Sequence, residues 1–124
     1  MIVTVNDIML GISMINSMNI GDSLPYKTAR ELYKMKRILN EEFDFANQEY
    51  RKLLNKHHGI ETDKGDIQFD TPESCRAFQA DESAIRANEV ELGISVIDLS
   101  KYSDSISFRG NIDFDILEKF IRFE

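Results

Sequence analysis

The 124-residue sequence predicts a single α+β domain spanning residues 1–124. We expect a long helix folded as an antiparallel hairpin, a small, mostly antiparallel sheet of two or three strands, and a short C-terminal helix. The first observation is an unbroken helical repeat of apolar residues, and the second is a set of short segments in which apolar and polar residues alternate. The third is composition: 42% hydrophobic and 30% charged residues are enough for a real core and exclude a disordered chain.

The strongest signal is a run of apolar side chains spaced three or four residues apart after Ser23-Leu-Pro25. Pro25 is compatible with a first helical turn, and Gly59 suits a left-handed position just after the helix ends. A helix of about 33 residues would be about 50 Å long. One short neighbour cannot cover such a stripe, so it predicts either a hairpin within the chain or a seam between chains. The candidate seam residues are Leu32, Met35, Leu39, Phe43 and Leu53.

Two further helices have recognisable start signals. Thr4 or Asn6 can cap a first helix with Asp7 in its first turn, and we expect this helix to end near residues 19–21. Thr71 and Pro72 begin another helix, which we expect to run back along the long one.

The strand signals are short. Residues 92–99 are rich in strand-forming residues and residues 105–108 alternate in polarity, so the two segments predict a hairpin, with residues 66–70 as a candidate third strand. A final helix, capped by Asn111 or Asp113, then carries an aromatic tail that we expect to dock on the sheet.

No catalytic constellation is recognisable in the sequence. The lone Cys75 cannot form an intramolecular disulfide and lies among apolar residues, where a thiol is a poor nucleophile. His57 and His58 suit structural roles at the end of the long helix. The clusters of neighbouring carboxylates in the sequence are explained by a helix cap in one case and by the solvent-exposed face of the long helix in the other. We therefore expect a non-enzymatic protein with no metal and no cofactor.

The chain also has no feature of a membrane protein. Its longest uncharged run, residues 8–21, is too short and too polar to cross a bilayer. Residues 1–7 lack the basic segment of a secretion signal. We expect a cytoplasmic location, with no membrane partner.

Charge is distributed unevenly between the two halves. The net charge is −7, with about +1 on residues 1–60 and about −8 on residues 61–124, so we expect the second half not to bind nucleic acid. Its candidate contact residues for a basic partner are Glu89, Glu91 and Asp98.

One basic cluster opens the long helix. Lys27, Arg30, Lys34 and Arg37 follow a three-four-three spacing that places them on one helix face. This face either contacts phosphate or an acidic partner, or is paired. The pairing partners would be Glu31 and Glu41, or the acidic half of the same or a neighbouring chain.

The segment Leu24-Pro-Tyr-Lys-Thr-Ala-Arg-Glu-Leu-Tyr-Lys, followed by Leu39-Asn-Glu-Glu, resembles small proteins encoded by phages and prophages of low-GC Gram-positive bacteria. Glu89-Val-Glu-Leu92, with Ile97, Leu99 and Ser100, is similar to their C-terminal region. The resemblance implies a viral setting and no particular activity. The methionine-rich first helix and the aromatic tail depart from the pattern.

Three functions follow as hypotheses. The first is a phage accessory protein that binds a host or phage protein and inhibits a host defence or nucleic-acid-processing factor, because an acidic surface can occupy a basic channel. The second is a virion or assembly component that forms a homo-oligomer through the long helix. The third is a sponge for a nucleotide signal held by the basic face.

Overall fold

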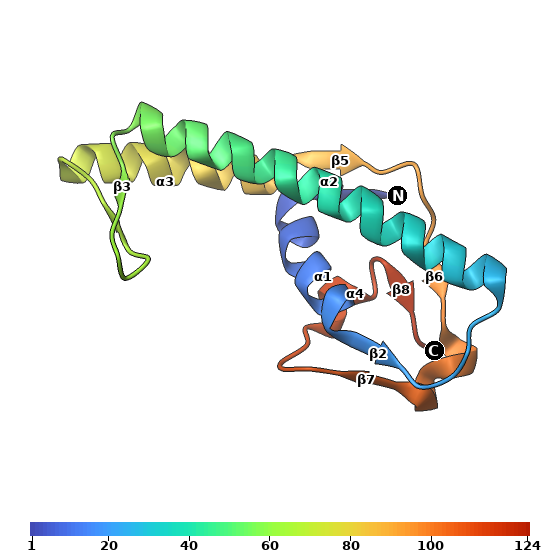
Figure 1. Cartoon of the computed structure of the whole chain (residues 1–124). Helices are drawn as coiled ribbons and strands as arrows, with labels where there is room; N and C mark the ends of the chain where they lie inside the picture. The colour runs from blue at the N-terminus through green and yellow to red at the C-terminus, as the bar shows by residue number, and fades with distance from the viewer.

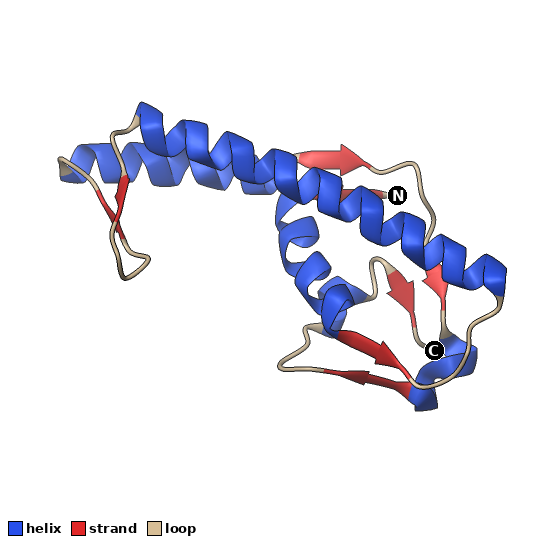
Figure 2. Ribbon diagram, viewed as in Figure 1, coloured by secondary structure: helices blue, strands red, loops and turns tan.

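The computed structural model describes all 124 residues and has an α+β fold (Figure 2). The helical elements are α1 (Val5–Ser17), α2 (Tyr26–Lys56), α3 (Pro72–Ala87), the short α4 (Phe114–Leu117) and the 3₁₀ helix η1 (Ser100–Ser105). The strands are β1 (Ile2–Thr4), β2 (Met18–Ile20), β3 (Ile60–Glu61), β4 (Ile67–Gln68), β5 (Glu89–Glu91), β6 (Ile97–Asp98), β7 (Ile106–Phe108) and β8 (Ile121–Arg122).

The long helix α2 organises the molecule. It has 31 residues, so it is about 46 Å long, and this confirms the helix predicted from the apolar repeat. Its N-terminal part lies over α1 and the C-terminal strands, whereas its C-terminal part projects beyond them with α3 running back alongside (Figure 1). Pro25 precedes the first turn as the N-cap instead of lying within it.

The hydrophobic core lies under the N-terminal part of α2. Leu32 (7% exposed), Met35 (1%) and Leu39 (0%) belong to a cluster of 14 buried residues that also takes side chains from α1, α4 and several strands. Phe43 packs against the same cluster, and Leu53 is half-buried further along. The prediction of a seam between chains is therefore wrong for Leu32, Met35 and Leu39, because their own chain already covers them.

The strand pairing differs from the prediction. Residues 92–99 and 105–108 do not form a hairpin, and there is no single sheet of two or three strands. Four separate two-stranded pairs form instead: β1 with β5, β2 with β7 and β3 with β4 are antiparallel, and β6 with β8 is parallel. Each strand has only two or three residues, so alternation in the sequence could locate strand segments but could not choose their distant partners.

Helix α1 begins with a complete capping box. The backbone N–H of Asp7 donates to Thr4 Oγ1 (3.1 Å), and the backbone N–H of Thr4 donates to the Asp7 carboxylate (3.0 Å), which confirms Thr4 as the N-cap. Burial raises the pKa of Asp7, but the hydrogen bonds from Thr4 and from Lys119 (3.0 Å) outweigh it and hold this pKa below its ordinary value. The helix ends at Ser17, earlier than predicted, because residues 18–20 pair with β7.

The projecting part of the molecule, here called the arm, consists of the C-terminal half of α2, the β3–β4 pair and α3. Its small core surrounds Phe78, which is 4% exposed and contacts the rings of Tyr50 (centroids 5.4 Å apart) and Phe69 (5.2 Å).

The turn between α2 and β3 corrects another prediction. His58, with φ of 57°, takes the left-handed position that we assigned to Gly59. Gly59 is needed for a different reason: a Cβ at this position would lie 2.9 Å from Leu54 Cδ2 and 3.0 Å from Phe69 Cε1. The N–H of Gly59 donates a hydrogen bond to the Leu54 carbonyl (2.7 Å), which completes the C-terminal cap of α2.

The C-terminal tail packs into the body through aromatic contacts. Asp113 caps the four-residue α4, and strand β8 follows instead of further helix. Phe114 and Phe123 contact each other and Phe108 of β7 edge to face, with centroids 5.9–6.1 Å apart. The tail is therefore built into the fold, as its apolar content predicts.

Candidate protein-interaction surface

A basic face runs along the first turns of α2. It consists of Lys27, Arg30, Lys34 and Arg37, all of them exposed. The structure contains seven ion pairs, and none involves any of these four residues. The interpretation that Glu31 and Glu41 pair with them within the chain is therefore wrong. Four cations are free for a ligand or another molecule.

Two aromatic residues share this face, and sequence reasoning missed them. Tyr26 is 79% exposed and Tyr33 is 61% exposed. Tyr33 lies three residues after Arg30 and four before Arg37, so the three side chains neighbour one another on the helix surface. The sequence does place both tyrosines outside the apolar repeat. At such positions large rings face water, because no other part of the chain packs against them. Exposed aromatic rings among cations are typical of contact surfaces.

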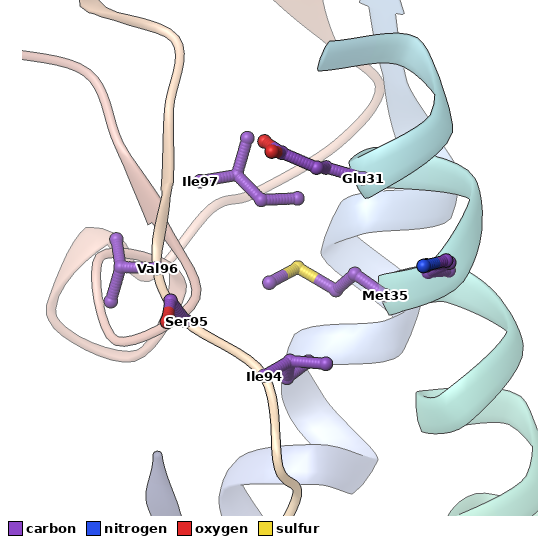
Figure 3. A pocket seen from close by; sticks show the side chains of 7 residues that line it. Glu31, Met35, Ile94, Ser95, Val96 and Ile97 are labelled. Carbon is purple, nitrogen blue, oxygen red and sulfur yellow. The ribbon is translucent and has the colours of Figure 1, made fainter. Parts of the chain in front are cut away.

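A small hollow borders the basic face. It has a volume of about 270 Å³ and lies between the first turns of α2 and the segment 94–97. Figure 3 shows Glu31 and Met35 facing this segment across the hollow, and Lys34 also lines it. Only one of the four cations borders this hollow, so it does not form an enclosed phosphate site.

The three acidic residues proposed for partner binding have different surroundings in the structure. Glu91 accepts hydrogen bonds from the Gly93 N–H (2.9 Å) and the Met1 amino group (3.0 Å), which lower its pKa. Asp98 accepts a hydrogen bond from the Ser100 N–H (2.9 Å), and Ser100 likewise lowers the pKa of Asp98. These two carboxylates stabilise local turns, whereas Glu89 is exposed and makes no such bond. A charge reversal at all three positions would therefore disturb the fold as well as the surface.

A second hollow lies where the arm leaves the body. This groove has a volume of about 310 Å³ and lies between α1, α2, α3 and β5. Apolar side chains including Ala46, Ile85 and Val90 line it, and Phe45 remains 58% exposed on its wall. Glu42 and Glu49 flank these side chains on α2. The groove is therefore apolar with an acidic rim, and the sequence did not reveal it because its walls come from four distant segments.

The arm carries the one histidine–carboxylate contact. His57 Nε2 lies 2.8 Å from Asp81 Oδ2, and Lys56 Nζ lies 3.4 Å from the same oxygen. The His57 hydrogen bond, followed by that of Lys56, lowers the pKa of Asp81. His57 is largely buried beside Phe78, so it joins α2 to α3, in agreement with a structural role. Cys75 is half-buried and unpaired.

No three His, Cys, Asp or Glu side chains come together in the way that a bound metal ion requires. None of the helices combines the length and the apolar composition needed to cross a membrane. The groups with the clearest interaction chemistry are therefore the basic face of α2 and the acid-rimmed groove.

No protein family, no curated protein and no solved structure matches the chain.

Proposed function

We propose that the protein acts without catalysis, by binding an acidic surface of another protein through the basic face of α2. The observation that carries the proposal is that Lys27, Arg30, Lys34 and Arg37 are all exposed and all outside the seven ion pairs. Unpaired cations on a rigid helix need no rearrangement to meet carboxylates, so they favour fast, charge-steered association.

The exposed rings on this face support a protein partner. Tyr26 and Tyr33 supply broad contact area with few rotatable bonds, and Tyr and Arg together are enriched at the centres of protein interfaces. The resemblance to phage and prophage proteins suggests that the partner is a host or phage protein, and a second copy of this chain would itself be a phage protein. The acidic second half gives less support to an inhibitor that mimics nucleic acid, because Glu91 and Asp98 already make local hydrogen bonds.

A nucleotide sponge is the second candidate, since the same cations would also attract phosphate. It is less favoured because the cations lie on a convex helix, and only Lys34 borders a hollow. Small-molecule sites normally enclose most of their ligand.

The test uses poly-L-glutamate as a stand-in for an acidic surface and fluorescence anisotropy as the measurement. We expect binding that weakens with salt, and about a thirtyfold loss in the variant Arg30→Glu/Arg37→Glu, since each of the two exposed charges contributes about 0.5 kcal/mol and reversal doubles the effect to about 2 kcal/mol in total. The control Lys64→Glu/Arg109→Glu changes the net charge equally at exposed positions elsewhere.

If Arg30→Glu/Arg37→Glu and the control Lys64→Glu/Arg109→Glu bound poly-L-glutamate equally well, the proposed role of the basic face would be refuted. Preferential binding of a single-stranded oligonucleotide or a cyclic dinucleotide over poly-L-glutamate would also overturn the proposal, the second in favour of the sponge.

A further inference from the structure

We infer that the acidic partner is a second copy of this chain, whose acid-rimmed groove receives the basic face of α2 in a head-to-tail contact. This inference deepens the proposed function and rests on it. It makes use of two surfaces that the fold leaves uncovered and that lie on the same helix.

The two surfaces match in charge and in spacing. On the basic face, Arg30 and Arg37 lie seven residues apart, and on the groove Glu42 and Glu49 also lie seven residues apart. Two helical turns separate the members of each pair, which corresponds to about 10.5 Å along the axis. The two guanidinium groups of one copy can therefore meet the two carboxylates of another without stretching either helix.

The positions between the charges match as well. Tyr33 lies between the two arginines and is 61% exposed, and Phe45 lies between the two glutamates and is 58% exposed. Burying these two rings against each other and against Ala46 would remove apolar surface that no part of the same chain covers. Glu42 forms no ion pair, and the exposed Lys52 that pairs with Glu49 (2.9 Å) is easily exchanged, because surface pairs of this kind contribute little.

The placement of the two surfaces requires a second molecule. Glu42, Phe45 and Glu49 of the groove lie twelve residues after Arg30, Tyr33 and Arg37 of the basic face, respectively. Twelve residues correspond to about 18 Å along α2 and about a third of a turn around it. A rigid helix cannot fold back on itself to join them. Because the two faces point in different directions, a symmetric pair of α2 helices cannot satisfy both at once. Each contact leaves one groove and one basic face free, so the arrangement propagates or closes into a ring.

The experiment measures mass by size-exclusion chromatography with light scattering, from about 1 μM to about 1 mM, the range in which small interfaces associate. For the wild type we expect a mass that rises with concentration and falls with added salt. Arg30→Glu/Arg37→Glu and Glu42→Arg/Glu49→Arg should each be monomeric, with at least a tenfold weaker association. Lys64→Glu/Arg109→Glu is the control and should associate as the wild type does.

Mixing the two monomeric variants supplies the decisive result. Every face–groove contact between them joins opposite charges, so the mixture should associate again although neither variant does so alone. Phe45→Ala and Tyr33→Ala should each weaken the association of the wild type.

Three results would overturn the inference. They are a wild type that stays monomeric throughout the concentration range, a mixture that stays monomeric, and a Glu42→Arg/Glu49→Arg variant that associates like the wild type. In each case, salt-sensitive binding of poly-L-glutamate that depends on Arg30 and Arg37 would leave the proposed function standing with a different partner.

Discussion

Gly11 packs closely against the buried ring of Phe120, and replacing it with alanine tests this packing directly. Gly11 lies in the middle of α1, and a Cβ added there would lie 2.6 Å from Cε2 and 3.1 Å from Cδ2 of Phe120. Ordinary carbon–carbon contacts are about 3.5–4.0 Å long. The Phe120 ring is fully buried, so it cannot swing into solvent to relieve the overlap.

The magnitude follows from two opposing contributions. Alanine is better than glycine inside a helix by about 1 kcal/mol. Overpacking of a filled core costs about 1–3 kcal/mol, and an overlap of about 1 Å on a buried ring belongs at the upper end. We therefore expect Gly11→Ala to lower the free energy of unfolding by about 2 kcal/mol. In urea, this corresponds to a midpoint shift of about 1 M.

The assay is urea unfolding followed by far-ultraviolet circular dichroism. The control Ser13→Ala lies on an exposed position of the same helix and should be neutral or slightly stabilising. The double variant Gly11→Ala/Phe120→Leu should be less destabilised than the sum of its single changes, because the smaller side chain makes room for the new methyl group. A Gly11→Ala variant as stable as the wild type would contradict this prediction, since Gly11 would then face a space that can relax.

Two further predictions concern the arm. His58→Gly should raise the free energy of unfolding by about 0.5 kcal/mol, because glycine removes the strain of a left-handed residue. Part of this gain is lost because glycine also makes the unfolded chain more flexible. His58→Ala keeps the strain, so in urea unfolding it should show no such gain. Asp81→Asn should lower the thermal midpoint near pH 6, because the pKa of the Asp81 carboxyl is depressed in the folded state. A carboxyl group with a depressed pKa stabilises the fold at pH values above its unfolded pKa of 3.8, and this stabilisation is lost as the pH falls through the folded pKa. The difference from the wild type should therefore shrink below about pH 4, and a difference that is unchanged at pH 2.5 would show that Asp81 acts through something other than its charge.

The sequence alone determined those features that depend on neighbours along the chain. The apolar repeat predicted α2 almost to its observed ends, since a helix face is built from residues three and four apart. Thr71 was identified as an N-cap and Thr4 was one of two candidates, because capping bonds join residues only a few positions apart. The basic face was also visible, as its four members lie within eleven residues of one helix.

Features that depend on pairing between distant parts of the chain followed from the three-dimensional packing alone. The strands β2 and β7 are separated by about ninety residues, and each has too few residues to specify its partner by pattern. The groove behind Glu42 and Glu49 exists only because α3 and β5 return to α2 at Ala46. The same packing turned Leu32, Met35 and Leu39 inward, away from any second chain, and left Tyr33 and Phe45 in water. A helical repeat specifies which residues share a face, but the rest of the chain decides which face is covered.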